Sequence, residues 1–293
     1  MKAFSSFHPA ALFSYFAAVI VVAMFASDPF MHIEALIGGF FFCLCLQRKK
    51  EILSNIGFYI PLFLLIAVTN PIFAHDGVTP LFFLNGNPVT LEAVFCGIGL
   101  AITLVAVMLW CRCFSDVMTT DKFLCLFGKP FPKTALVLSS ALRFIPEFKK
   151  RIRKVKQAQK AMGFYSSKSF VSRFQSAERV FSAMTSWSIE SSIDTASAMK
   201  ARGYGQKGRT SFSPFRFEKR DLIFLIFVFA MFSVTIACIA AGKATFLYYP
   251  EIIPPTVTLS LIAARTAFGI LCLTPTAIEI KEALLWKYCV SKI

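Results

Sequence analysis

Long apolar runs are the feature of this sequence that most constrains its fold. Five of them approach the roughly 20 residues that an α-helix needs to cross the hydrocarbon core of a bilayer. A sixth, shorter run ends at a basic cluster, as the cytoplasmic flank of a membrane span does. The six runs cover residues 10–27, 33–46, 52–69, 89–111, 221–241 and 256–274, and the second is the short one. We therefore expect an all-α integral membrane protein with about six transmembrane helices.

The composition supports several spans. Hydrophobic residues make up 56% of the chain and charged residues 16%, with a mean hydropathy of +0.65, which is too apolar for an ordinary soluble domain. The first run is expected to remain as a span, because no small-residue cleavage site followed by a soluble domain comes after it. Asn87 and Pro88 are expected to be the cap and the first helical residue of the fourth span.

The excess positive charge lies in one internal segment. Residues 112–220 hold 22 Lys+Arg against 7 Asp+Glu, a net charge of +15 that equals the net charge of the whole chain. Cytoplasmic segments of membrane proteins carry such an excess, so we expect this segment and both termini in the cytoplasm of a cell-membrane protein. We divide the chain into N-terminal transmembrane helices (1–111), a basic cytoplasmic region (112–220), and C-terminal transmembrane helices with a tail (221–293).

Two long helices are predicted within the basic region. In the first, an apolar stripe recurs at spacings of three and four residues and basic residues occupy the other faces. This stripe consists of Phe148, Ile152, Val155, Gln159 and Met162. The second helix, from about residue 176 to residue 201, is rich in serine and alanine, which allow close packing against another helix. Its stripe consists of Ala177, Val180, Met184 and Trp187.

Both predicted helices end in the same short pattern. Residues 158–164 read AQKAMGF and residues 198–204 read AMKARGY, so each fits A-x-K-A-x-G followed by an aromatic residue. Glycine directly after a helix favours the left-handed C′ position, and lysine in the last turn suits the negative end of the helix dipole. We expect each copy to present an exposed cationic helix end, with Gly163 and Gly203 at C′.

Motifs that carry catalysis are absent from the sequence. It holds no phosphate-binding loop, no H-E-x-x-H and no G-x-S-x-G, and its few acids near the spans lie at predicted span edges. The nine cysteines form no C-x-x-C pair and only three histidines are present, so no metal site is expected. No recognised nucleic-acid-binding module occurs either. We expect no catalytic residue, no cofactor, no metal and no nucleic-acid partner.

Three stretches together resemble the transmembrane T component of energy-coupling factor (ECF) transporters, a class of ATP-binding-cassette (ABC) importers. They read NPIFAHDGVTPLFFLNGNPVTLEA, ALRFIPEFKKRIRKVKQAQKAMG, and AMKARGYG with a downstream GRT, and the similarity runs from about residue 67 to residue 210. The resemblance implies a membrane scaffold whose cytoplasmic coupling helices dock into grooves of two ABC ATPase subunits, which bind the ATP. A separate substrate-binding membrane protein, the S component, captures a vitamin or a transition-metal ion.

The resemblance also implies which residues dock. The implied set is Lys160, Ala161, Met162 and Gly163 at the first helix end and Lys200, Ala201, Arg202 and Gly203 at the second. Met162 stands where the family has arginine. Lys160 supplies a charge near it but cannot reproduce the planar fork of a guanidinium, and Met162 can instead pack into an apolar part of the groove.

Two other functions remain open from the residues alone. An integral membrane enzyme would use the basic cytoplasmic face to act on a phosphorylated lipid, and activity in the isolated chain would favour it. A conventional permease would bind its substrate directly in its spans, and binding of a small ligand to the isolated chain would favour that. Part of the charge also suits attraction of the first amphipathic helix to anionic lipid of the bilayer.

Overall fold

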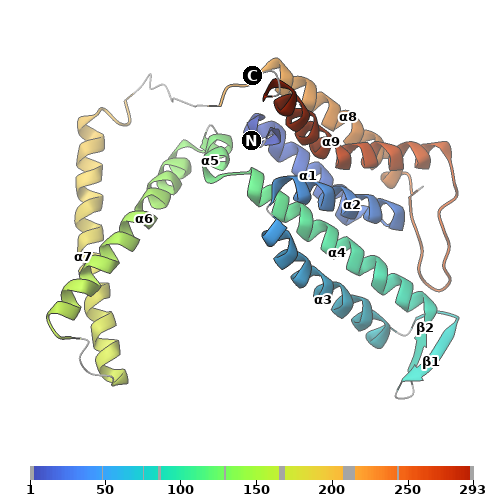
Figure 1. Cartoon of the computed structure of the whole chain (residues 1–293), viewed down its shortest axis with the longest axis horizontal. Coiled ribbons are helices and arrows are strands. Elements are labelled where there is room, and N and C mark those ends of the chain that lie inside the picture. The colour runs from blue at the N-terminus through green and yellow to red at the C-terminus, as the bar shows by residue number, and fades with distance from the viewer. Residues whose placement is uncertain are drawn as a thin grey trace. The chain divides into compact units, whose positions relative to one another are not determined.

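The computed structural model describes residues 3–47, 49–74, 76–84, 87–128, 130–164, 169–206, 215–242 and 244–290. The chain folds into two compact units, one of residues 1–123 and 215–293 and the other of residues 124–214 (Figure 1). The described residues form nine α-helices, one short 3-10 helix (Phe4–Ser6) and a two-stranded sheet. Each unit is described here by itself.

The first unit is a bundle of six apolar helices. They are α1 (Pro9–Phe25), α2 (Pro29–Leu46), α3 (Lys49–Phe73), α4 (Leu91–Val117), α8 (Lys219–Ala240) and α9 (Leu259–Val290). Five of them are long and apolar enough to cross a membrane, and α1 is a shorter apolar helix of 17 residues. Each of the six predicted runs therefore forms a helix, and the prediction of an all-α membrane protein is confirmed.

Helix α4 lies inside this bundle, with α2 and α3 each packed along it (Figure 1). Helix α2 also packs along α9, which packs against α8, and α8 packs against α1. Glycine permits the close approach of α2 to α9, because a Cβ added at Gly38 would lie 2.6 Å from the Cβ of Cys272. The largest fully buried side chains of the resulting core are Trp110, Tyr15, Phe4, Phe16, Phe42 and Phe268.

A buried ion pair joins the α1–α2 turn to α9. The Nε and Nη2 atoms of Arg265 donate to the two carboxylate oxygens of Asp28 over 2.6 and 3.0 Å. Asp28 is fully buried and is also the N-cap of α2. The forked contact satisfies both oxygens of a charge that would otherwise be costly to bury.

The connection between α3 and α4 contains an antiparallel hairpin of β1 (Pro80–Leu84) and β2 (Asn87–Thr90). The prediction that Asn87 and Pro88 begin the fourth span is therefore wrong. Helix α4 begins at Leu91 and Thr90 is its N-cap, with its hydroxyl accepting a hydrogen bond from the backbone N–H of Ala93 over 3.3 Å. Pairing with β1 keeps the two residues extended, and a threonine cap two positions after Pro88 replaces the cap predicted at Asn87.

The second unit is an antiparallel pair of long helices, α6 (Pro132–Ala161) and α7 (Phe170–Ala201), which α5 (Thr120–Gly128) precedes. The rings of Phe148 and Trp187 meet edge to face, with centroids 5.3 Å apart. The predicted stripes are confirmed at most positions, and Val180 and Met184 are buried. Two predicted positions are instead exposed: Met162, because α6 ends before it, and Ala177, which lines an open space between the two helices.

Candidate functional site: two matching helix ends

Helix α6 ends in a Schellman motif. Gly163 has a φ of +80°, and its N–H donates to the carbonyl oxygen of Lys160 over 3.1 Å. The N–H of Phe164 donates to the carbonyl oxygen of Gln159 over 3.2 Å. These two bonds satisfy carbonyls that the end of a helix leaves unpaired. The turn leaves Met162 at the tip of the helix with 63% of its surface exposed.

Helix α7 ends in the same motif at the equivalent positions. Gly203 has a φ of +73°, and its N–H donates to the carbonyl oxygen of Lys200 over 3.0 Å. The N–H of Tyr204 donates to the carbonyl oxygen of Met199, also over 3.0 Å. Arg202 is exposed at the C-cap, the position that Met162 occupies in the first copy. The repeated pattern therefore encodes one backbone structure twice, and the prediction that each glycine adopts the left-handed C′ conformation is confirmed.

The first helix end is fastened to the start of α7. The hydroxyl of Ser176 donates to the carbonyl oxygen of Phe164 over 3.2 Å, and the guanidinium of Arg179 lies 4.3 Å from the centroid of the Phe164 ring. The aromatic residue that follows the glycine in the pattern thus anchors the turn, partly through a cation–π contact.

The second helix end lies at the opposite end of α7. A helix rises about 1.5 Å per residue, so the part of α7 between Ser176 and Ala201 separates the two ends by roughly 40 Å. The structure therefore does not bring the two predicted docking sets together in one pocket. It places them as two separate and similarly shaped ends of one helical pair.

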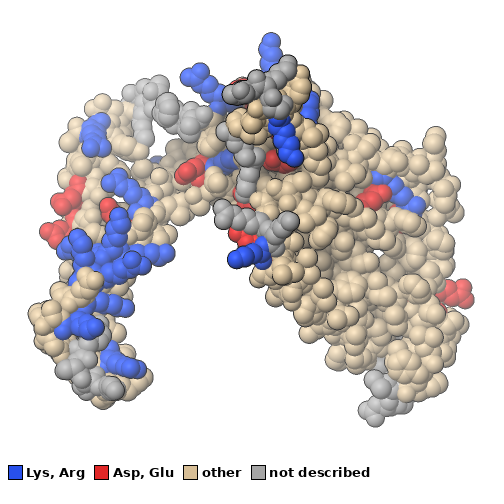
Figure 2. All heavy atoms as spheres, in the orientation of Figure 1, with Lys and Arg blue, Asp and Glu red and all other residues tan. Residues whose placement is uncertain are grey.

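Positive charge covers this unit. Residues 124–214 hold 17 Lys+Arg against 4 Asp+Glu, a net charge of +13. Figure 2 shows basic side chains gathered over α6 and α7. Arg151 of this group also lies over the ring of Trp187, 5.6 Å from its centroid. A surface of this kind attracts acidic partners, whether carboxylates of a protein or headgroups of anionic lipid.

Apolar surface is exposed beside the charge. A groove with a volume of about 550 Å³ runs between α6 and α7, and its apolar lining includes Ile152, Val180 and Met184. Phe170 and Phe174 of α7 are largely exposed, and Phe181 lines the groove while remaining exposed. Clusters of exposed aromatic side chains mark surfaces that contact a protein or a membrane.

Sequence reasoning missed a polar clamp around the N-terminal segment. The carboxylate of Glu279 in α9 accepts hydrogen bonds from the N–H groups of Ala3 and Phe4 over 3.1 and 2.9 Å. Asp221 at the start of α8 accepts one from the N–H of His8 over 3.0 Å. Glu279 is only 8% exposed, and its place as the first acid of an otherwise apolar stretch of α9 is its one signal in the sequence.

A lysine extends this clamp to α5. The ammonium group of Lys122 donates to the carbonyl oxygens of Ser5 and Val117 over 2.6 and 3.0 Å, and the side chain is buried. The N-terminal segment is thereby tied to the end of α4 and to the helix that leads into the second unit. The carbonyl of Ser5 is distant from Lys122 in the sequence, and that of Val117 lies outside the helix of Lys122. Helical periodicity therefore could not reveal either contact.

Among the residues that the structure describes, no three His, Cys, Asp or Glu side chains are grouped so that they could hold a metal ion.

Comparison with known proteins identifies the family. The sequence profile named CbiQ and described as "Cobalt transport protein" matches residues 3–212. The chain belongs to this family. Its matched part runs from the N-terminal clamp through both helix ends, so the two ends are within the family's shared region.

The chain is also similar to curated proteins described as transmembrane proteins of energy-coupling factor transporters. The chain is 33% identical over 104 residues to the energy-coupling factor transporter transmembrane protein EcfT of Lactobacillus helveticus (strain DPC 4571), covering 35% of this chain and 38% of that protein. It is 36% identical over 99 residues to the EcfT of Listeria innocua serovar 6a, covering 33% and 37%. The EcfT of Streptococcus thermophilus is 30% identical over 112 residues, covering 38% and 42%. The matches thus span about two fifths of each relative, and the resemblance inferred from the sequence is confirmed.

Proposed function

We propose that the chain is the membrane scaffold and coupling subunit of an ECF-type importer. One observation carries this proposal: the same Schellman end occurs twice on a cationic helical pair joined to an apolar helix bundle. Membership of a transport family, and relatives named as ECF transporter transmembrane proteins, support it. The second unit and both termini are proposed to be cytoplasmic, because the positive charge is concentrated in that unit.

Each helix end is proposed to dock into a groove of one of two ABC ATPase subunits. Arg202 offers a planar fork of donors that suits carboxylates, whereas Met162 at the equivalent position offers an apolar contact. Ala161 and Ala201 are small and let a groove wall approach the backbone. The glycines turn the chain away from the tip, and Lys160 and Lys200 add charge from the last turn of each helix.

ATP-driven closure of the two ATPase subunits would change the distance between their grooves. Small shifts of packed helices are a known way of transmitting such a change. The rings of Phe148 and Trp187 are in contact, so a shift of α7 would be transmitted to α6 there. From there the displacement would reach the bundle along α5, which Lys122 ties to α4 and to the N-terminal segment.

Substrate capture is assigned to another polypeptide in this proposal. The S component, a separate membrane protein, would bind the vitamin or transition-metal ion, and the exposed phenylalanines of α7 offer an apolar surface for a membrane partner. An enzyme acting on phosphorylated lipid, or a permease that binds its own substrate, would instead show activity or ligand binding in the isolated chain.

Copurification from cells in mild detergent tests the docking assignment. Arg202→Glu should repel an acidic groove, so we expect loss of the ATPase subunits and of uptake while the protein remains inserted in the membrane. Arg143→Glu makes the same charge change near the middle of α6, 18 residues before the first helix end, and should retain the partners. Equal retention of ATPase subunits by the two variants would refute docking through the second helix end.

A further inference from the structure

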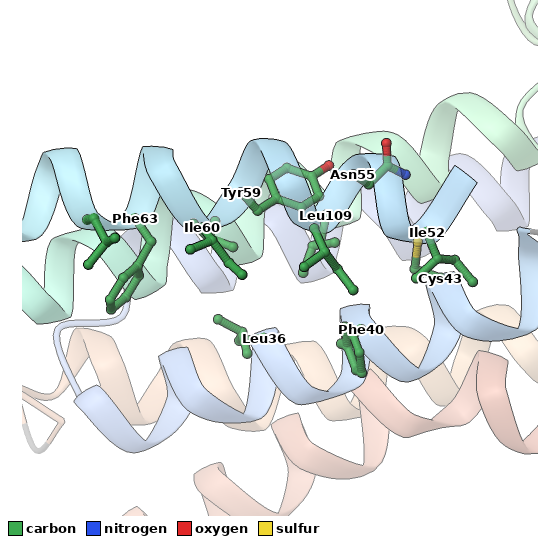
Figure 3. Close-up of a pocket in the computed structure, with 12 residues that line it drawn as sticks. Leu36, Phe40, Cys43, Ile52, Asn55, Tyr59, Ile60, Phe63 and Leu109 are labelled. Carbon is green, nitrogen blue, oxygen red and sulfur yellow. The ribbon is translucent and has the colours of Figure 1, made fainter. Parts of the chain in front are cut away.

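A lateral apolar groove opens between α2 and α3. These helices each pack along α4 but barely touch one another, which leaves a space of about 430 Å³ (Figure 3). The most apolar 18-residue stretch of α3 contains no buried residue, so this helix lies at the outside of the bundle, where the groove would open to the bilayer. Its lining includes Leu36 and Phe40 of α2, Ile60 and Leu64 of α3, and Val105 and Leu109 of α4.

One end of the groove is polar. Asn55 and Tyr59 line that end, and Figure 3 shows the hydroxyl of Tyr59 directed toward Asn55. The Nδ2 atom of Asn55 donates to Gln47 over 2.7 Å, and the Nε2 atom of Gln47 donates to Asp116 over 2.6 Å. The polar side chains of this network therefore gather at one end of the groove, where we expect the helices to emerge from the membrane.

Positive charge predominates around the polar end. Arg112 of α4 is exposed and lies one helical turn beyond Leu109, which lines the groove. In the sequence, positions 48–50 are all basic, and the last two of them are the first residues of α3. The acidic residues nearest to these basic residues in the sequence are Glu51 and Asp116. One carboxylate oxygen of Asp116 already accepts a hydrogen bond from the side-chain amide of Gln47. The balance favours an anionic headgroup.

We propose that this groove binds one acyl chain of an anionic phospholipid, whose headgroup lies against Asn55, Tyr59 and Arg112. Lipid tails are as apolar as leucine side chains, so moving an acyl chain from the surrounding lipid into the groove gains little free energy from the hydrophobic effect. The groove must nevertheless be filled, because an empty space would deprive its lining of dispersion contacts. Charge-assisted hydrogen bonds to the phosphate then select which lipid stays.

The volume of the groove and the leaflet at which its polar end is expected to lie both agree with a bound anionic phospholipid. Small-molecule sites commonly have volumes of about 300–1,000 Å³, which includes the size of this groove. The orientation suggested under the proposed function puts the polar end at the cytoplasmic leaflet, where anionic lipids are concentrated. The inference goes beyond that function and uses only its orientation.

Photolabelling tests the acyl-chain site. The full chain, with any partners that copurify, is placed in nanodiscs containing phosphatidylglycerol with a diazirine on its acyl chain, and labelled peptides are identified by mass spectrometry. We expect labelling on the facing sides of α2 and α3. Leu64→Trp should fill the groove and remove this label, whereas Leu65→Trp should keep it. The two leucines are adjacent and similarly exposed, at 56% and 63%, but Leu65 does not line the groove.

The headgroup is tested by comparing phosphatidylglycerol with phosphatidylcholine that carries the same diazirine. A basic residue near the membrane surface favours anionic lipid by about fivefold, so Arg112→Ala should reduce the preference by about that factor while Arg112→Lys keeps it. Equal labelling of the Leu64→Trp and Leu65→Trp proteins, or photocrosslinks from the groove to a copurifying protein in place of lipid, would overturn the site. Equal labelling by both lipids would overturn the headgroup assignment. Retention of ATPase subunits is measured separately, so failure of either proposal is recognisable by itself.

Discussion

Residues 162 and 202 occupy the same place in two copies of one backbone motif, yet one is methionine and the other is arginine. Both side chains are exposed beyond the last helical residue, so neither is selected by packing within its own helix. We infer that the difference concerns what each helix end contacts outside the chain. In the proposed complex, the two grooves that receive the ends would then differ in chemistry.

Exchanging these side chains tests that inference. Arg202→Met removes charge-assisted hydrogen bonds, so binding of the ATPase subunits should weaken by about tenfold or more. Met162→Arg should also weaken binding, because an unpaired guanidinium is costly to bury in an apolar groove. Met162→Leu keeps an apolar side chain and should bind normally. Affinity is measured with the chain in nanodiscs, and stronger binding by Met162→Arg would show instead that the first groove is acidic.

The glycine after each helix can be tested without changing any contact. A Cβ at Gly163 would meet no atom within 4 Å, so the effect of Gly163→Ala comes from the backbone conformation alone. The left-handed conformation costs a non-glycine residue about 1–2 kcal/mol, and amides 163 and 164 should exchange about tenfold faster with deuterium. Gly163→Asn should exchange at an intermediate rate, because asparagine tolerates this conformation better. Unchanged exchange in the alanine variant would contradict the assigned motif.

The residue scale also shows where sequence reasoning succeeds and where it fails. Gly163 and Gly203 were predictable, because a helix followed by glycine is a local pattern with a local cause. The bonds from Glu279 to the N–H groups of Ala3 and Phe4 were not, since they join residues about 275 positions apart. The docking role of the helix ends stays a prediction that the copurification experiment addresses.

At the scale of elements, apolar length predicted the bundle but not its ends. Each of the six runs forms a helix because a span must satisfy its own backbone. Several helices continue past the apolar run that revealed them, as α4 does to Val117 and α9 to Val290. Hydropathy detects the part that faces lipid and misses polar turns that continue the same helix. The hairpin before α4 was missed because its pairing depends on β1 as well as on Asn87 and Pro88.

The approach of α2 to α9 depends on one glycine. A Cβ at Gly38 would also lie 3.0 Å from the carbonyl oxygen of Cys272, so Gly38→Ala must push the helices apart. Such overpacking costs about 1–3 kcal/mol, and the apparent melting temperature in detergent should fall. Gly57→Ala makes the same substitution in α3, where a Cβ would meet nothing within 4 Å, and should not lower it. Equal melting temperatures of the two variants would mean that α2 and α9 are not packed as described.

At the scale of the whole molecule, the distribution of charge already separated two kinds of structure. The unit of residues 124–214 has a net charge of +13, whereas the rest of the chain is nearly balanced, at +2. A balanced apolar unit suits the bilayer and a cationic unit suits the cytoplasm. Composition could not reveal the groove between α2 and α3, because that space depends on how the two helices pack against α4.

The single helix that joins the two ends has a mechanical consequence. In the proposed complex, one ATPase subunit holds the end of α6, which Ser176 and Arg179 fasten to α7, and about 25 residues of continuous helix connect it to the subunit that holds the end of α7. Neither subunit can then be displaced without straining its neighbour's attachment. Movement driven by ATP at either nucleotide site would act on the same helix. The conformational change for transport would therefore require both ATPase subunits together.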